Sequence, residues 1–318
     1  MADVAIIGLG PVGLSLAQAT TRAFSGAAVI GFDPDKSRVR RAREAGMFDS
    51  VTDRLSMALA GASLVVVDTP LRDAPAALES IGRLAPASCI VTDTCSLKRP
   101  VLDWAAKFLP PSMGFVGGHL IVEQSADAYM VSTAGATYCL VCDASTSSEA
   151  VGVVTALASA AGAKPLFIDA DEHDSFVLAS CLLPKIANGA AIDAVIRSSA
   201  WRDIQNLRSD LFDLTASSSL AADSGDVSLS DIASLGVDNV GPLVFWIERL
   251  EGELKSLRES IVRGLAAGEM VDFDALTRER LDLLTQRSSA QPKIERSGVR
   301  SLILGDWLTN RAKQRRET

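Results

Sequence analysis

Residues 4–13, VAIIGLGPVG, join an apolar run to a glycine-rich turn and then to the start of a helical pattern. The run VAII predicts a buried strand, and PVGLSLAQATTRAF at 11–24 has the apolar spacing of a helix. Gly8, Gly10 and Gly13 form a G-x-G-x-x-G between the two. A glycine motif at the first strand-to-helix turn predicts a doubly wound α/β fold.

Further strand patterns alternate with helical patterns through the first 170 residues. Apolar runs that predict strands lie at 27–33, 62–70, 88–94, 114–120, 137–144 and 165–171, and helical patterns lie at 38–46, 73–85 and 101–109. This alternation is typical of a parallel sheet with crossover helices. From about residue 172 the patterns are helical only, at 173–198, 237–268 and 270–289, with a small-polar loop at 217–231. We therefore predict a Rossmann-type dinucleotide-binding domain over residues 1–170 and an all-α substrate and dimerisation domain over 171–318.

The glycine motif carries the predicted cofactor site. Gly8 allows the tight turn, Gly10 lets the backbone approach a pyrophosphate, and Gly13 permits close packing of the helix. The helix N-terminus then offers unpaired N–H groups to the anion. The predicted cofactor-binding residues are Gly8, Leu9, Gly10, Pro11, Val12, Gly13, Asp33, Thr69 and Pro70.

Asp33 bears on which dinucleotide binds. It ends the second predicted strand, twenty residues after Gly13, where an acid accepts hydrogen bonds from the adenosine ribose hydroxyls and repels a 2′-phosphate. The sequence therefore predicts NAD over NADP. Lys36 and Arg38 follow closely and weaken that preference.

Composition and charge exclude several classes of protein. A net charge of -8 argues against nucleic-acid binding, which needs a clustered basic surface. We expect no membrane span, because no window approaches the roughly 18 apolar residues that one requires. The odd count of five cysteines suits a reducing cytoplasm. Cys139 and Cys142 form a C-x-x-C, but we expect no metal, because no second pair or nearby histidine completes a site.

Polar residues follow three of the predicted strands. Asp68-Thr69-Pro70 follows LVVV, residues 93–98 (DTCSLK) follow CIVT, and Gly117-Gly118-His119 follows GFV. Open α/β sheets bind ligands at the carboxyl ends of their strands, so these residues should face the nicotinamide end of the cofactor. A dehydrogenase needs a group that takes the hydroxyl proton, and histidine suits this role because its pKa lies near neutrality.

The order of these motifs resembles that of the prephenate/arogenate dehydrogenase family. The motifs are GLGPVG at 8–13, DTCSLK at 93–98, VGGH at 116–119, DEHD at 171–174 and the LLP of SCLLPK at 180–185. The resemblance covers most of the chain and implies a nucleotide-binding domain joined to a helical dimerisation domain, and hence a homodimer. It also implies hydride transfer from a ring carbon to NAD(P), with loss of carbon dioxide as the ring becomes aromatic.

The resemblance assigns roles to particular residues. His119 matches the catalytic histidine that hydrogen-bonds the substrate's ring hydroxyl, and Ser96 matches the serine that orients it. Lys98 belongs to the same motif, as a catalytic residue or as a surface lysine at a helix start. His173 is interpreted as a structural link between domains, in preference to a base.

The chain departs from the family pattern at the substrate pocket. Leu120 and the residues after it replace the proline and glycine that follow the family's histidine. Leu182 and Lys185 stand where the family's S-H-L-P-H motif has its two histidines, and Ala216 stands where an arginine pairs with a substrate carboxylate. Lys185 is our candidate for the replacement charge. Arg197, Arg202 and Arg208 are further candidates that are equally well explained as solvated helix residues.

Three interpretations follow from this pattern. The chain is a working dehydrogenase with an altered substrate pocket, which the joint presence of Asp33, Ser96, Lys98 and His119 favours. Alternatively, it is a dinucleotide-binding regulatory or structural subunit without that activity. A hydroxyacid or imine reductase with the same two-domain plan is the third, but it does not account for the GGH and EHD motifs.

Overall fold

The computed structural model describes residues 3–122, 129–143, 145–220, 232, 240–267 and 278. The chain divides into two compact units, Met1–Glu251 and Gly252–Thr318. The described part of the second unit consists of residues 252–267 and Arg278. The functional boundary at residues 170 and 171 remains a prediction.

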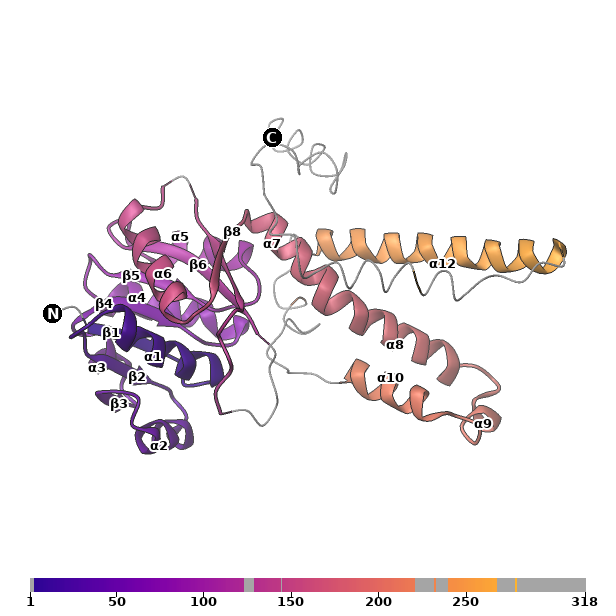
Figure 1. Ribbon diagram of the computed structural model, residues 1–318, viewed down its shortest axis with the longest axis horizontal. Coiled ribbons are helices and arrows are strands. Elements are labelled where there is room, and N and C mark those ends of the chain that lie inside the picture. Colours follow the sequence, from indigo (N-terminus) through magenta and orange to yellow (C-terminus); the bar gives the residue numbers. More distant parts are fainter. Residues whose placement is uncertain are drawn as a thin grey trace. The chain divides into compact units, whose positions relative to one another are not determined.

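The first unit contains an eight-stranded sheet (Figure 1). Its strands are β1 (Asp3–Ile7), β2 (Val29–Phe32), β3 (Ser50–Thr52), β4 (Ala62–Val67), β5 (Ile90–Asp93), β6 (Gly114–Ile121), β7 (Thr137–Val141) and β8 (Lys164–Phe167). The order is β3-β2-β1-β4-β5-β6-β7-β8, and β1 to β6 are parallel. This is the predicted doubly wound arrangement, in which the order reverses between β1 and β4. The last two strands differ from the prediction, because β7 runs antiparallel to β6 and β8 runs parallel to β7.

Helices connect and cover the strands. Those of the sheet region are α1 (Pro11–Ala23), α2 (Lys36–Ala45), α3 (Leu55–Leu59), α4 (Ala74–Leu84), α5 (Arg99–Phe108) and α6 (Ser148–Ala160), with a 3-10 turn at Leu71–Asp73. After β8 come α7 (Ala170–Val177), a π-helical turn (Leu178–Leu182), α8 (Leu183–Ile196), α9 (Trp201–Ile204), α10 (Asp210–Leu220) and α12 (Gly241–Ala267). Within the described residues no strand follows β8, as predicted.

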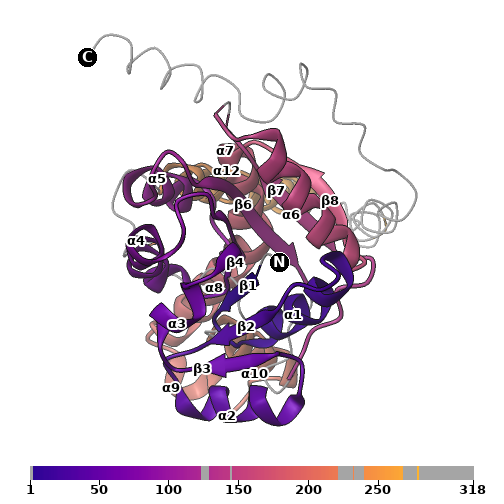
Figure 2. The same cartoon turned by 90° about the vertical axis from the view of Figure 1, so that its left-hand side faces the viewer.

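Alternating strand residues build two cores, one on each face of the sheet. Ala5 and Ile7 of β1 belong to the core formed with α3, α4 and α5, whereas Val4 and Ile6 belong to the core formed with α1 and α6. Figure 2 shows these helix groups on opposite sides of the strands. Both faces are covered, which explains why the strands read as continuous apolar runs instead of alternating ones.

The helix from Ala170 to Ile196 begins inside the first core and leaves it. Val177, Leu178 and Leu182 are buried there, whereas α8 contains no buried residue. By length and composition this is the one helix among the described residues that could cross a membrane, with a mean hydropathy of 1.4 in a window that is 22% buried. The expectation that no window approaches a span is therefore wrong on this measure. The reason is that leucines, alanines and isoleucines outnumber its few charged residues.

The remaining helical predictions are confirmed only in part. The pattern at 237–268 forms α12 from Gly241 onward. The stretch predicted as a loop from residue 217 is helical as far as Leu220, and most of the rest lies outside the described residues. The pattern at 270–289 also lies outside them, except that Arg278 is helical.

Candidate functional site

The glycine turn packs against the end of β4. Gly8 has a positive φ of 104°, and a Cβ atom there would lie 1.9 Å from the carbonyl oxygen of Asp68. A Cβ at Gly13 would lie 2.4 Å from the carbonyl oxygen of Gly8. Neither position therefore has room for any residue except glycine. The turn holds the start of α1 directly above the sheet edge.

Asp68 ties this turn to two strand ends. Its Oδ2 accepts a hydrogen bond from the Gly13 N–H at 2.7 Å, and its Oδ1 accepts one from the Thr94 hydroxyl at 2.6 Å. Burial raises the pKa of the Asp68 carboxyl, against the lowering effect of these two hydrogen bonds. The sequence places Asp68 only at the end of a predicted strand and carries no signal for these two hydrogen bonds.

Asp33 is buried, with 2% of its surface exposed. Its Oδ2 accepts a hydrogen bond from the Leu9 N–H at 2.9 Å, and its Oδ1 accepts one from the Asp35 N–H at 2.8 Å. Arg38 Nη1 lies 3.5 Å from Oδ2. Asp33 therefore positions the glycine turn, and part of its charge is balanced by a guanidinium.

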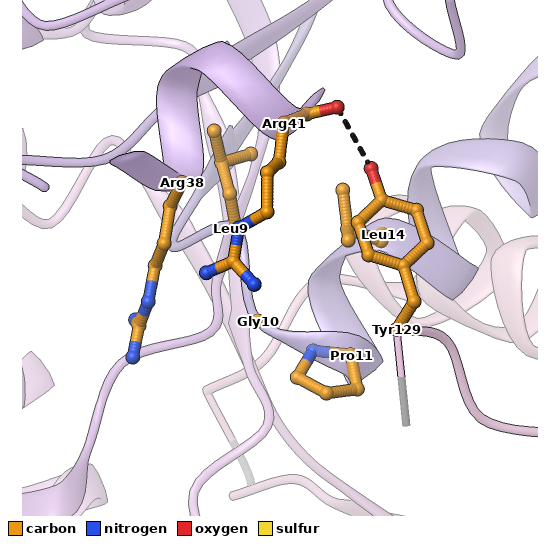
Figure 3. Close-up of a pocket in the computed structure, with 7 residues that line it drawn as sticks. All are labelled: Leu9, Gly10, Pro11, Leu14, Arg38, Arg41 and Tyr129. Carbon is orange, nitrogen blue, oxygen red and sulfur yellow. Dashed lines mark hydrogen bonds between the residues drawn. The ribbon is translucent and has the colours of Figure 1, made fainter. Parts of the chain in front are cut away.

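A small pocket opens beside the turn (Figure 3). Its lining consists of Leu9, Gly10, Pro11, Leu14, Arg38, Arg41 and Tyr129. Figure 3 shows the guanidinium of Arg41 beside Leu9, and the Tyr129 hydroxyl donates to the Arg41 carbonyl oxygen at 3.0 Å. Arg41 and Tyr129 were not predicted. Arg41 carries no motif that distinguishes it from the other arginines of RVRRAR.

These residues fit a dinucleotide. The glycine turn leaves the backbone bare at the N-terminus of α1, where no side chain caps the helix, and such a terminus attracts phosphate. Thr69 Oγ1 is buried and has no hydrogen-bond partner among the described residues. It is therefore free to bond a ligand at the end of β4. Pro70 is exposed next to it.

The strand that carries His119 is held by a buried ion pair. Lys98 Nζ contacts Asp93 Oδ2, and both side chains are almost completely buried. Lys98 Nζ also donates to the Gly118 carbonyl oxygen at 2.6 Å, while the Gly118 N–H donates to Asp93 Oδ1 at 3.0 Å. A Cβ at Gly118 would lie 2.5 Å from the Asp93 carbonyl oxygen, so only glycine fits before His119. The interpretation of Lys98 as a surface lysine is wrong.

The ring of His119 is buried and contacts a second histidine. His119 Nδ1 lies 3.0 Å from His173 Nε2, and His173 Nδ1 lies 2.8 Å from Asp174 Oδ1. Burial, followed by the nearby His173 and Lys98, lowers the pKa of His119 well below its usual 6.5. His119 is therefore neutral near pH 7, and a neutral imidazole can accept a proton.

The other predicted residues are placed differently. Ser96 is buried, and its hydroxyl makes no hydrogen bond to any described residue, so its predicted contact with His119 is not made. Lys185 is half-buried on α8, without an ion pair among the described residues. Arg197 and Arg208 pair with aspartates on the surface. The described residues contain no cluster of acids, histidines and cysteines that could hold a metal.

Comparisons with known proteins agree with this geometry. Residues 16–166 match the family model of the prephenate dehydrogenase nucleotide-binding domain. The prephenate dehydrogenase of Bacillus subtilis (strain 168) is 25% identical over 194 residues, which cover 59% of this chain and 52% of that protein. The chain thus spans about half the length of the curated relative that it matches.

Solved structures show the same fold along most of the chain. A prephenate dehydrogenase from A. aeolicus, in complex with hydroxyphenyl propionate and NAD+, has a TM-score of 0.73 at 19% identity and covers 89% of this chain and 98% of its own. The Synechocystis arogenate dehydrogenase has a TM-score of 0.68 at 22% identity and covers 90% and 98%. Residues 16–166 are therefore similar to the nucleotide-binding domain of prephenate dehydrogenases. The predicted resemblance to the prephenate/arogenate dehydrogenase family is thus confirmed.

Proposed function

We propose that this protein is a nicotinamide-dinucleotide-dependent dehydrogenase that oxidises a cyclic hydroxy acid, with a substrate pocket that differs from the family pattern. The observation that carries the proposal is a buried His119 at the carboxyl end of β6, on the sheet edge where the glycine turn lies. Ligands of open α/β sheets bind along that edge. A regulatory subunit would need the glycine turn but not the pair of histidines behind it.

His119 is the proposed proton acceptor. Its uncharged ring takes the proton of the substrate hydroxyl as hydride leaves the carbon that bears this hydroxyl. The dinucleotide, when bound, supplies the hydride acceptor. If the substrate is prephenate or arogenate, the ring also loses carbon dioxide and becomes aromatic. Lys98 acts at this centre by holding Gly118 and not by touching substrate. A catalytic role for Ser96 rests on the family resemblance alone.

Lys185 is the proposed partner of a substrate carboxylate. It is half-buried and has no acid paired with it among the described residues. An ammonium in that position is available to a carboxylate, as the arginine replaced by Ala216 would be. Because lysine offers a point charge instead of a bidentate fork, we expect a substrate whose carboxylate sits differently.

NAD is the first candidate for the cofactor, on the basis of Asp33. A specific observation favours NADP as the second: Arg38 partly neutralises Asp33, and Arg41 lines the adjacent pocket. Titration with NADH and with NADPH, followed by cofactor fluorescence, separates the two. If the Arg41 guanidinium contacts a 2′-phosphate, Arg41→Ala should weaken the binding of NADPH much more than the binding of NADH. Equal weakening would assign Arg41 to the pyrophosphate.

The proposal includes a homodimer formed through the helical region, in a cytoplasmic protein. The apolar side chains of this region support it, because Leu207, Leu211 and Leu214 are each at least 66% exposed and α8 has no buried residue. A protein partner suits the helix from Ala170 better than a lipid bilayer does, because its first turns bond to Lys98 and His119 of the sheet region. Size-exclusion chromatography with light scattering should give twice the mass of 33.5 kDa.

The decisive test of the activity is spectrophotometric. The purified chain is mixed with NAD or NADP and with prephenate, arogenate or other cyclic hydroxy acids, and formation of the reduced cofactor is followed. His119→Asn is the matched control, expected to bind cofactor normally and to lose about 100-fold to 10,000-fold in turnover. Cofactor binding without turnover of any of these acids would favour the regulatory-subunit interpretation.

A further inference from the structure

The chain contains two histidines, and they contact each other. The ring centroids of His119 and His173 lie 5.1 Å apart with planes at 76°, and the contact joins Nδ1 of the first to Nε2 of the second at 3.0 Å. A hydrogen bond between two imidazole nitrogens requires a proton on one and a lone pair on the other. The direction of this bond therefore decides which nitrogen of His119 is free.

Asp174 sets that direction. Its Oδ1 lies 2.8 Å from His173 Nδ1 and accepts the Lys98 N–H at 2.6 Å, while its Oδ2 accepts the Arg99 N–H at 2.8 Å. These two N–H groups lie at the start of α5, where a negative charge is stabilised. An ionised carboxylate only accepts hydrogen bonds, so Nδ1 of His173 is the donor.

The remaining positions follow from this assignment. In a neutral His173 with its proton on Nδ1, Nε2 holds a lone pair. His119 must then donate from Nδ1, which leaves the lone pair of His119 on Nε2. In water a neutral histidine favours the opposite tautomer, with the proton on Nε2, so the contact selects the minor form.

We infer that Asp174 and His173 are positioning residues that fix His119 in the tautomer with a free Nε2 and share the charge that it gains. The tautomer follows from the hydrogen bonds alone, whereas charge sharing rests on the proposed function. When Nε2 accepts the substrate proton, the Nδ1 proton of His119 can move to Nε2 of His173. His173 then carries the positive charge beside Asp174, and no other proton changes place.

Burial makes this transfer useful. His119 and His173 are 6% and 1% exposed, so water cannot solvate an imidazolium at either ring, and an unpaired buried charge is costly. The other nearby charge, on Lys98, is positive and is already paired with Asp93. Asp174 is therefore the one carboxylate bonded to this pair of rings among the described residues.

Lys98 connects both parts of this hydrogen-bond network. Lys98 donates its backbone N–H to Asp174 and its ammonium to Gly118, which precedes His119. The backbone and the ring of His119 are thus held from the same point. These two hydrogen bonds from Lys98 therefore hold the 3.0 Å contact between His119 and His173 in place relative to β6.

Nitrogen NMR of the whole chain labelled with 15N-histidine tests the tautomer without any substrate. At a pH where both rings are neutral, we expect the 15N signal of a protonated nitrogen from Nδ1 and that of an unprotonated nitrogen from Nε2 in both rings. The His173→Gln variant contains His119 alone, so its spectrum shows which signals belong to His119. In that variant His119 should shift toward the Nε2-protonated form. A proton on Nε2 of His119 in the unaltered chain would overturn the inference, whether or not the protein turns over a substrate.

The pH dependence of turnover tests charge sharing. Asp174→Asn removes the negative charge and should lower kcat by about 100-fold or more, as in other carboxylate–histidine pairs, and should shift the limb governed by His119. Asp171→Asn, on the same helix but exposed and paired with Arg99, is the matched control and should change neither. An unchanged pH profile in a folded Asp174→Asn variant would contradict a shared charge.

Discussion

The carboxyl ends of β1 and β4 and those of β5 and β6 are built by different means. At the first pair, the shape comes from backbone: glycines that approach within contact distance, and N–H groups that bond Asp33 and Asp68. At the second pair, it comes from buried charged side chains, chiefly Asp93 and Lys98. A backbone site depends on the absence of side chains, whereas a side-chain site depends on every partner being present. The two ends should therefore respond differently to substitution.

The largest effect is expected at the side-chain end, from Lys98→Met. This change leaves the Asp93 carboxylate buried without its partner, which should lower the free energy of unfolding by about 3–5 kcal/mol. Urea denaturation measures it. Lys107→Met, at an exposed lysine over the Phe108 ring, is the control, expected to lose less than about 1 kcal/mol. If the two variants were equally stable, the buried pair would not support the strand.

A smaller effect is expected at the backbone end, from Gly13→Ala. The added Cβ would lie 2.4 Å from the Gly8 carbonyl oxygen, and such overpacking costs about 1–3 kcal/mol. Dinucleotide affinity should fall as well, because the turn must open. Gly152→Ala is the control: its Cβ meets nothing within 4 Å on α6, so it should be neutral or stabilising by up to about 1 kcal/mol. Unaltered cofactor binding in Gly13→Ala would separate the glycine turn from the cofactor site.

Lys185 belongs to neither end and sharpens the comparison from the helical side. Lys185→Met should raise the KM for a carboxylate substrate about 10-fold, at a cost near 1.4 kcal/mol, with little change in stability or in cofactor affinity. Arg197→Met, which breaks an exposed pair with Asp193, should leave KM unchanged. Equal KM values for the two variants would show that Lys185 does not bind the substrate carboxylate.

The pH dependence of stability tests the side-chain end, at β5 and β6, through the titration of His119. Because burial lowers the pKa of His119 below its unfolded value of 6.5, the unfolded chain binds this proton first as pH falls. Stability should therefore decrease below about pH 6.5, by at most about 1.4 kcal/mol per pH unit from this group. Urea unfolding at pH 7.5, 6.5 and 5.5 measures the slope, and His119→Asn should reduce it. A slope unchanged in that variant would place the titration elsewhere.

The backbone end could be predicted from the sequence because its signals are local. Gly8, Gly10 and Gly13 lie within six residues of one another, and their spacing alone predicts the turn. The side-chain end depends on pairings across long separations, such as Lys98 with Asp174, 76 residues away. The VGGH and DEHD motifs single out His119 and His173 as candidate site residues, but they do not show that the two rings are in contact. Periodicity likewise could not show that β7 reverses direction, since a buried strand reads the same both ways.

The π-helical turn at Leu178–Leu182 has a consequence for the helix that contains it. Successive residues of an α-helix are rotated by about 100°, so Lys185, twelve positions after His173, would stand about 120° around a regular helix. A π turn accommodates one extra residue, which reduces the effective separation to eleven steps and the rotation to about 20°. The turn thus rephases the helix, so that the lysine and the histidine project from nearly the same side.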